Sequence, residues 1–253
     1  MSREVDWVNL GIMRLIRAAK AIVRLALLMF QRSATKKRWG SRTSAEAING
    51  YLSQIDGPNS YFLVDFFGAM QFKSFLEIGS NCGNRLIPLA LKFPNTHFVG
   101  VDINGDAILI GQEYTREHAI PNVTLLQFDI TSKEFYEFLK SNDFDIVFSW
   151  ATLIYLHPID LVRLLKSLLI ATQRFVFIEQ MYSRKNRFFP RSLPARNFLQ
   201  WKHDFVGIIE DGLNSDQTLV FDSSSVPNHI WSPAGGGAVL ISGEIVTPNL
   251  RSF

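Results

Sequence analysis

Short apolar runs alternate with segments of helical length and pattern through the middle of the chain, from Phe75 to Gln180. Each run is rich in Val, Ile, Leu or Phe, which is typical of a buried strand. The predicted strands span residues 75–78, 97–101, 123–128, 144–149 and 175–180, and the helices between them span 85–93, 105–118, 133–140 and 158–171. Because parallel strands need a helix-length connection, this order predicts an α/β fold, a doubly wound and mostly parallel sheet with helices on both faces.

The segments before and after this alternation have a different pattern. The elements predicted there are helices over residues 45–55, 59–71 and 197–213 and strands over residues 218–222 and 238–245. No crossover helix separates the last two strands, so a parallel connection between them is excluded. We expect them to form an antiparallel pair at one edge of the sheet, which brings the sheet to seven strands.

An amphipathic helix is predicted near the N-terminus, because apolar residues recur at helical spacing over residues 7–30. A basic stripe on the opposite face consists of Arg14, Arg17, Lys20 and Arg24. A membrane span needs about 20 apolar residues with few charges, and these four cations interrupt every such window. Neither a transmembrane helix nor a secretory signal is therefore expected here.

The charge is divided unevenly along the chain. Ten of the 26 basic residues but only two of the 23 acidic residues lie in residues 1–42, which gives this arm a net charge of +8 and leaves −5 on the remainder. We expect a basic helical arm, residues 1–42, followed by one domain, residues 43–253. Its core covers residues 74–181, and its tail strands lie within residues 197–253.

Several partners would suit the basic arm. Through residues 7–39 it has the composition of a helix that lies on an anionic membrane surface, with its apolar face in the lipid. The same apolar face could instead pack on the protein's own body or on a second copy of the chain. Binding to nucleic acid is not expected, because no motif for base readout accompanies the charge.

The composition fits a globular protein of a reducing compartment. Hydrophobic residues make up 47% of the chain and charged residues 19%, which is enough apolar mass for a sizeable core. Cys82 is the only cysteine, so an intramolecular disulfide is excluded, and no Cys/His spacing or carboxylate cluster predicts a metal site. We expect a cytoplasmic protein, peripheral on the inner face of a membrane if the arm binds lipid.

A glycine-containing turn follows the first predicted strand. Gly79 and Gly83 lie at its carboxyl end, where ligands of open α/β sheets bind and where glycine lets the backbone approach a ligand closely. The spacing fits neither the dinucleotide-binding motif nor a phosphate-binding Walker loop. Glu77 beside the turn would repel a pyrophosphate and attract an ammonium group, which favours a cationic ligand.

Two carboxylates follow at the ends of the next predicted strands. Asp102 comes about 20 residues after the glycine turn, at the position that binds ribose hydroxyls in nucleoside sites. Asp129, after the third strand, is a candidate acceptor for the exocyclic amine of an adenine. Turns and helix caps also use glycine and aspartate, but three such positions in register at successive strand ends favour a nucleoside site.

These segments resemble the class I S-adenosylmethionine-dependent methyltransferases over about residues 74–181. The runs that carry the resemblance are LEIGSNCG, VGVDI, LLQFDI and DIVFSWATLIYLHP. The resemblance implies a Rossmann-like fold and S-adenosylmethionine as the cofactor. The residues it implies for cofactor binding are Glu77, Gly79, Ser80, Asn81, Gly83, Asp102, Ile103, Asp129, Ile130 and Ser149. Asn81 replaces a glycine of many members, a mild departure because Asn tolerates left-handed backbone.

Methyl transfer to a hydroxyl benefits from a base that removes the proton. Candidates are His157 after the fourth strand, His203 with Asp204, and Glu179 at the end of the fifth strand. His157 would equally suit the N-cap of the following helix, and His203 with Asp204 would equally suit an exposed helix face.

The sequence thus predicts a methyltransferase, O-directed, acting on a small-molecule, glycan or lipid-linked acceptor at or near a membrane surface. Two other functions stay open at this point. One is a non-catalytic nucleoside-binding scaffold docked on a membrane, and the other is a nicotinamide-dependent oxidoreductase.

Overall fold

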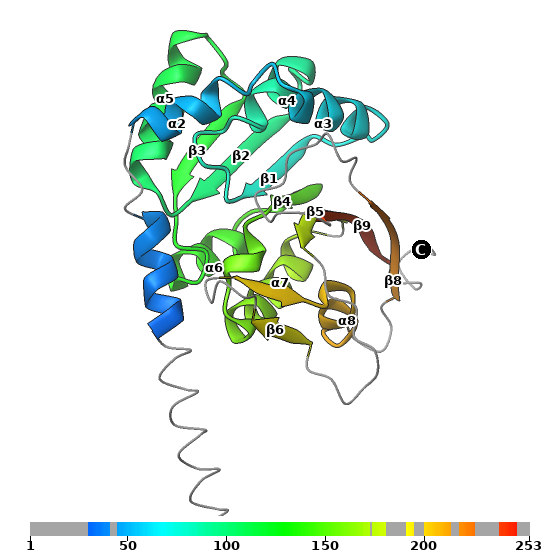
Figure 1. The fold of residues 1–253 in the computed structure, drawn as a ribbon. Coiled ribbons are helices and arrows are strands. Elements are labelled where there is room, and N and C mark those ends of the chain that lie inside the picture. The colour runs from blue at the N-terminus through cyan, green and yellow to red at the C-terminus, as the bar shows by residue number, and fades with distance from the viewer. Residues whose placement is uncertain are drawn as a thin grey trace, which may run out of the picture.

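The computed structural model describes residues 30–40, 45–172, 174–180, 191–194, 200–213, 218–225 and 238–246. Its centre is a seven-stranded sheet in the order β3-β2-β1-β4-β5-β9-β8 (Figure 1). The strands are β1 (Ser74–Ile78), β2 (His97–Asp102), β3 (Val123–Gln127), β4 (Ile146–Trp150), β5 (Arg174–Gln180), β8 (Thr218–Ser225) and β9 (Ala238–Val246). The first five pair in parallel, and β9 pairs antiparallel with both β5 and β8. The predicted parallel sheet with an antiparallel closing pair is confirmed.

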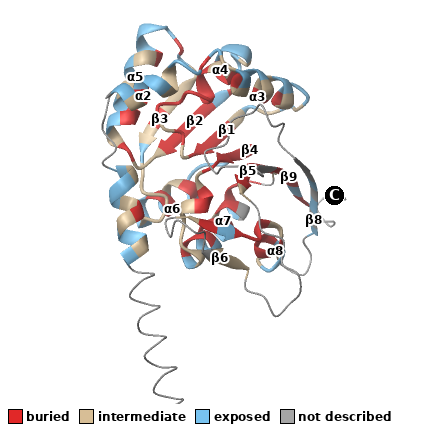
Figure 2. Cartoon of the chain, in the orientation of Figure 1, coloured by how far each residue is buried: buried red, intermediate tan, exposed pale blue. Residues whose placement is uncertain are grey.

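Helices cover both faces of the sheet. One layer contains α2 (Ala45–Leu52), α3 (Pro58–Gly68), α4 (Leu86–Lys92) and α5 (Gly105–Glu117), and the other contains α6 (Lys133–Lys140), α7 (Pro158–Ala171) and α8 (Phe205–Glu210). Buried residues concentrate along the strands and on the helix faces turned toward them (Figure 2). Alternate residues of the strands therefore belong to two apolar clusters, one on each face of the sheet.

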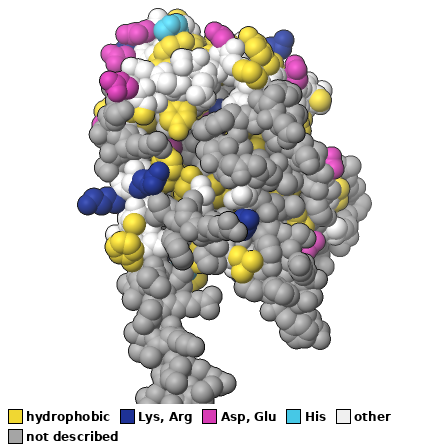
Figure 3. Space-filling model, viewed as in Figure 1, with side chains coloured by type: hydrophobic (Ala, Val, Ile, Leu, Met, Phe, Trp, Pro, Cys, Tyr) yellow, Lys and Arg dark blue, Asp and Glu magenta, His cyan; other side chains and the backbone are white. Residues whose placement is uncertain are grey.

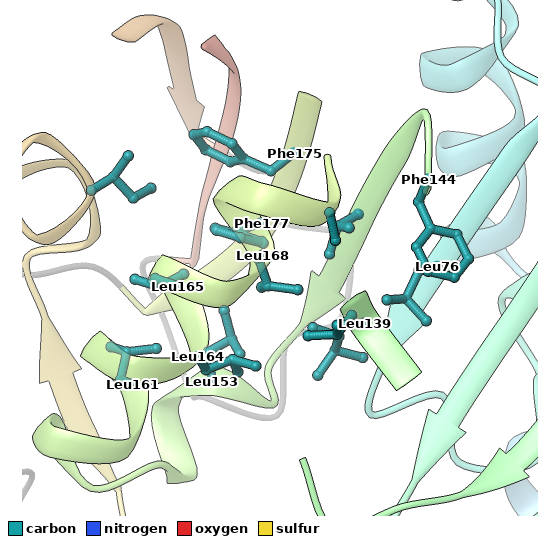
Figure 4. Packing of buried hydrophobic residues seen from close by; sticks show 14 of the residues in the cluster. Leu76, Leu139, Phe144, Leu153, Leu161, Leu164, Leu165, Leu168, Phe175 and Phe177 are labelled. Atoms are coloured by element: carbon teal, nitrogen blue, oxygen red, sulfur yellow. The ribbon is translucent and has the colours of Figure 1, made fainter. Parts of the chain in front are cut away.

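The cluster under α6 and α7 shows how the sequence pattern produces this packing. Leu161, Leu164, Leu165 and Leu168 recur at helical spacing along α7, and each is at most 2% exposed (Figure 4). They pack against strand residues that include Phe177. At about 25 cal/mol per Å² of buried apolar surface, one such leucine contributes about 1.5–3 kcal/mol. This packing fixes α7, and with it the residues at the start of that helix.

Side-chain caps set where the helices begin. The side-chain Oδ1 of Asn104 accepts from the Ala107 N–H at the start of α5, and the Ser132 hydroxyl accepts from the Phe135 N–H at the start of α6. His157 accepts from the Ile159 N–H at the start of α7. The caps at α5 and α7 place Asn104 and His157 just beyond the carboxyl ends of β2 and β4.

The prediction of one helix over residues 197–213 is wrong in its described part. Trp201–His203 forms strand β7, paired antiparallel with β6 (Ser192–Pro194), and α8 begins only at Phe205. Asp204 caps α8 by accepting from the Gly207 N–H. The alternation at β7 covers only three residues, with Trp201 and His203 buried and Lys202 exposed, which is too short to distinguish from the start of a helix without its pairing partner.

A further helix, over residues 30–40, packs against the body at the ends of the strands. Arg32 forms an ion pair with Asp160 at the start of α7. Lys36 Nζ lies 2.6 Å from Asp129 Oδ2 after β3. The described part of the arm therefore contacts the protein's own body through charged side chains.

An aromatic contact adds to this docking. The ring of Trp39 lies 4.9 Å from that of Tyr155, which follows β4. Residues 7–29, which carry the rest of the predicted amphipathic helix, lie outside the described residues. Within the part of the chain that the structure describes, no helix is long and apolar enough to cross a membrane.

Candidate functional site

A cavity of about 160 Å³ opens at the carboxyl ends of β1, β2, β3 and β4. Its walls come from the loops that follow these four strands, from α2 and from the helix over residues 30–40. Parallel strands present their carboxyl ends at one edge, so residues far apart in the sequence meet here. The order β3-β2-β1-β4 reverses at β1, and the cavity lies at this reversal.

The turn after β1 has the backbone conformation that its glycines permit. Gly79 and Gly83 both have φ of +78°, and Asn81 between them has φ of +51°. A Cβ on Gly79 would lie 2.0 Å from Thr152 Oγ1, so any side chain there would collide with the loop after β4. Gly79 and Asn81 line the cavity, whereas Gly83 shapes the turn without lining it.

Asp102 fixes this turn and also lines the cavity. Its Oδ2 accepts from the Asn81 N–H at 2.9 Å, and its Oδ1 accepts from the Asn104 N–H at 2.9 Å. Burial raises the pKa of Asp102, while these backbone hydrogen bonds act against the rise. A carboxylate oxygen can accept two hydrogen bonds, so each oxygen keeps the capacity to bind a ligand hydroxyl.

Asp129 faces the cavity together with Ile130, but it already has partners. Its Oδ2 accepts from Lys36 at 2.6 Å, and its Oδ1 accepts from both the backbone and the hydroxyl of Thr131. Partial burial acts to raise the pKa of Asp129, but these hydrogen bonds and the charge of Lys36 outweigh it and hold the pKa below its usual value. Asp129 is therefore ionised at neutral pH.

Glu77 does not line the cavity, contrary to the prediction that its carboxylate meets the ligand. It is fully buried, and its Oε1 lies 3.3 Å from Arg85 Nη1. Burial raises the pKa of Glu77 to about 7, although the charge of Arg85 acts against the rise. Arg85 itself lines the cavity, beside Trp150. On this side the charged group at the wall is therefore a guanidinium, not a carboxylate.

Ser149 and Glu179 are bound to each other and away from the cavity. The Ser149 hydroxyl donates to Glu179 Oε1 at 2.8 Å, and the N–H groups of Thr152 and Leu153 donate to the same oxygen at 3.0 and 3.1 Å. Burial raises the pKa of Glu179 to about 7. These two residues hold the loop that follows β4, and neither lines the cavity.

His157 lines the cavity at the start of α7. Its Nδ1 accepts from the Ile159 N–H at 3.4 Å, so the alternative role as a helix cap is realised as well. Burial lowers the pKa of His157 below its usual value, so the imidazole is neutral at pH 7. A neutral imidazole that accepts at Nδ1 carries its proton on Nε2.

His203 and Asp204 lie outside the cavity. His203 is fully buried, its Nδ1 lies 2.8 Å from Ser192 Oγ, and burial lowers its pKa to about 3. Asp204 caps α8 and forms an ion pair with Arg191 at 2.6 Å. Both side chains thus have structural partners, and neither lines the cavity, although His203 lies close enough to His157 for the charge of His157 to affect its pKa.

Of the predicted cofactor residues, those that line the cavity are Gly79, Asn81, Asp102, Ile103, Asp129 and Ile130, whereas Glu77, Ser80, Gly83 and Ser149 do not. Sequence reasoning missed the arginine and the aromatic wall: Arg85, Tyr51, Tyr155 and Trp39. The position of Arg85, two residues after Gly83 at the start of a helix, was the available signal. Among the described residues no group of three His, Cys, Asp or Glu side chains could hold a metal ion.

Comparisons with known proteins fit this geometry. A family model described as a methyltransferase domain matches residues 75–173. An O-methyltransferase family protein from Burkholderia thailandensis has a similar structure, with a TM-score of 0.56, 12% identity and coverage of 79% of this chain and 60% of that one. For magnesium protoporphyrin IX methyltransferase from Synechocystis PCC 6803, solved with bound S-adenosylmethionine, the TM-score is 0.53, the identity 13%, and the coverage 85% and 97%.

EvdMO1 is similar with a TM-score of 0.50 and 14% identity over 73% of this chain, which spans only 39% of the EvdMO1 chain. No curated protein matches the sequence. By family model and by fold, residues 75–173 form a methyltransferase domain. This match lies within the segment whose strand-end motifs resemble the class I S-adenosylmethionine-dependent methyltransferases, and the fold of the chain is similar to that of a methyltransferase solved with S-adenosylmethionine bound.

Proposed function

We propose that the protein methylates a hydroxyl group of a small-molecule, glycan or lipid-linked acceptor. The observation that carries this proposal is the position of His157, a neutral imidazole on the wall of the same cavity that Asp102 lines. Bound S-adenosylmethionine supplies an electrophilic methyl group on its sulfonium. The protein's own part is to hold the two reactants in line and to accept the hydroxyl proton.

The residues around the turn after β1 suit this cofactor. A glycine cradle at Gly79, with no space for a Cβ, admits a ligand close to the backbone. The remaining lone pairs of Asp102 suit a ribose diol, and Ile103 and Ile130 offer apolar contacts to a base. Asp129 is our candidate for the adenine amine, although Lys36 and Thr131 share its oxygens.

The acceptor side is aromatic and polar. Trp39 and Tyr155 pack together on the wall of the cavity, and the ion pair between Arg32 and Asp160 lies near enough to His157 to affect its pKa. Aromatic rings beside charged hydrogen-bonding groups suit a hydroxylated acceptor such as a sugar. To act as a base, His157 would accept the hydroxyl proton at Nδ1 in exchange for its cap hydrogen bond, or at Nε2 in the other tautomer.

The test is methyl transfer from labelled S-adenosylmethionine to a panel of methyl glycosides, their polyprenyl-phosphate-linked counterparts, phenols and primary amines. We expect an alkali-stable ether on a hydroxylated acceptor. His157→Asn keeps an oxygen that can cap α7 but removes the base, so we expect kcat to fall by about 10²–10⁴-fold. Binding of S-adenosylhomocysteine should change by less than about threefold.

The control is His118→Asn, a change of an exposed histidine next to the end of α5, which should leave both quantities unchanged. Label found only in amines would contradict an O-directed enzyme. Cofactor binding without transfer to any acceptor, and no effect of His157→Asn, would favour the non-catalytic scaffold. Preferential binding of a nicotinamide cofactor would favour the oxidoreductase.

Association with an anionic membrane through the arm is the second part of the proposal. Phe30, 73% exposed, begins the described helix, and Ile159, 72% exposed, adjoins the Asp160 that pairs with Arg32. Two large exposed apolar side chains are thus neighbours in sequence of the ion-paired residues. Figure 3 shows basic side chains close to exposed apolar ones on this face of the molecule. This combination suits an interface rich in anionic headgroups.

Sedimentation with vesicles tests this association. The wild-type chain should sediment with vesicles that contain anionic lipid and not with neutral ones. A variant with Phe30→Ser and Ile159→Ser should bind more weakly. Equal sedimentation of both proteins, or a concentration-dependent dimer that the two changes abolish, would instead assign this surface to a body contact or to a second copy of the chain.

A further inference from the structure

Arg85 is a buried cation on the wall of the cavity. Its residue surface is 8% exposed, yet it is among the residues that line the cavity. It precedes the first residue of α4, directly after the glycine turn. A guanidinium that is nearly removed from water must be held by specific contacts.

Two contacts hold this guanidinium. Nη1 lies 3.3 Å from Glu77 Oε1, and the guanidinium carbon lies 5.0 Å above the ring of Trp150. Glu77 sits behind Arg85, fully buried and absent from the cavity wall. A guanidinium has five N–H donors in a planar fork, so one contact with Glu77 leaves it the capacity to bind a second carboxylate.

The carboxylates of the cavity come from other strands than Arg85. Asp102 ends β2 and Asp129 follows β3, and these are our candidates for the ribose and the adenine. Arg85 lies at the start of α4, after the turn that follows β1, beside Trp150 of β4. The charge of Arg85 also acts on Asp102, but no hydrogen bond or ion pair between the two is found among the described residues. A nucleoside held by Asp102 and Asp129 would leave the remaining part of the cofactor on the side of β1 and β4, where Arg85 lines the cavity. That part is an amino acid, which carries a carboxylate.

We infer that Arg85 binds the carboxylate of the aminoacyl group of S-adenosylmethionine, with Glu77 and Trp150 as positioning residues that fix the guanidinium. This rests on the proposed cofactor site and deepens it. The low exposure of Arg85 strengthens a charge-assisted, two-pronged contact with a carboxylate. It also explains why the carboxylate of Glu77 can stay off the cavity wall, since its charge is met by Arg85 and not by the ligand.

Calorimetric titration with a pair of ligands tests the assignment. The probes are S-adenosylhomocysteine and its decarboxylated analogue, S-adenosyl-3-thiopropylamine, which keeps the nucleoside, the sulfur and the amine. Wild type should prefer S-adenosylhomocysteine by at least about tenfold, equal to about 1.4 kcal/mol. In Arg85→Met the preference should fall to within about twofold of unity, with binding of the decarboxylated ligand changed far less.

Arg85→Lys provides a second variant if the methionine variant fails to fold, and it should keep only part of the preference because a lysine cannot form the two-pronged contact. The control is Arg116→Met, on an exposed arginine of α5, which should keep the full preference. Undiminished preference in folded Arg85 variants, or equal binding of both ligands by wild type, would overturn the assignment and leave the cofactor site standing. Binding of neither ligand by wild type would overturn the cofactor site and the assignment with it.

Discussion

Gly79 lies where the backbone is left-handed and where a Cβ would collide with Thr152. Gly79→Ala should therefore lower the free energy of unfolding by about 1–3 kcal/mol and weaken binding of S-adenosylhomocysteine. Gly50→Ala is the matched control, because a Cβ at this position in α2 meets nothing within 4 Å; it should be neutral or stabilise by up to about 1 kcal/mol. Chemical denaturation measures the free energy of unfolding of both variants. An equal change in Gly79→Ala and Gly50→Ala would contradict a steric role for Gly79.

Also at the scale of residues, the buried His203 makes the free energy of unfolding depend on pH. Burial lowers the pKa of His203 to about 3, whereas an unfolded histidine titrates near 6.5. Its contribution is complete above about pH 6.5 and is lost as the pH falls toward 3, because only the unfolded chain binds the proton in this range. Glu77 and Glu179 have the opposite effect: because their pKa values are raised to about 7, their contribution is lost as the pH rises from about 4.5 to 7.

A comparison with His203→Phe isolates the histidine from these carboxylates. The stability of wild type relative to this variant should decline by up to about 1.4 kcal/mol for each pH unit below 6.5. Urea unfolding at pH 7.5 and pH 5.5 measures the difference. A difference that stays constant between the two pH values would show that His203 is not held neutral by burial.

At the scale of elements, the helix over residues 30–40 is the part of the arm that the structure describes, and it packs on the body. It is held by Arg32 on Asp160 and by Lys36 on Asp129. Both cations are more than a third exposed, so each pair is expected to contribute only about 0.2–1 kcal/mol. Changing Arg32 and Lys36 together to Ala should raise hydrogen exchange in residues 30–40 while β1 to β5 stay protected. The opposite result, unchanged exchange in this helix, would mean that Trp39 alone docks it.

The elements also show what the sequence can and cannot predict. Strands β1 to β5 were predictable because each is a buried apolar run, and the edge position of β8 and β9 followed from the missing crossover. Strand β7 was not, because its three residues form a strand only by pairing with β6.

The site residues also differ in how far the sequence predicts them. The glycine turn and Asp102 follow from local backbone rules, so the sequence reveals them. The pairing of Glu77 with Arg85 and of Asp129 with Lys36 depends on packing between distant elements. The sequence pattern therefore placed Asp129 correctly after a strand but could not identify its partner, and it wrongly placed the Glu77 carboxylate on the wall of the cavity.

At the scale of the whole molecule, the two apolar clusters hold a rigid sheet whose strand ends build one cavity. In the proposed site the cofactor would spread over this edge, with the ribose at β2, the base at β3 and the amino acid near the turn after β1, and the acceptor would lie beside the loop after β4. The helix over residues 30–40 packs against the same edge. In this proposal the strand ends bind the methyl donor and the flanking segments contact the acceptor.

The binding of S-adenosylhomocysteine to wild type and to Asp102→Asn, measured by calorimetric titration, tests this account most directly. Asp222→Asn, at an exposed position of β8, is the control. We predict one site per chain in wild type, affinity at least about tenfold weaker in Asp102→Asn, since hydrogen bonds to a charged group contribute about 1.5–3 kcal/mol, and no change in Asp222→Asn. No heat with wild type, or equal affinity in all three proteins, would contradict a nucleoside site at the end of β2.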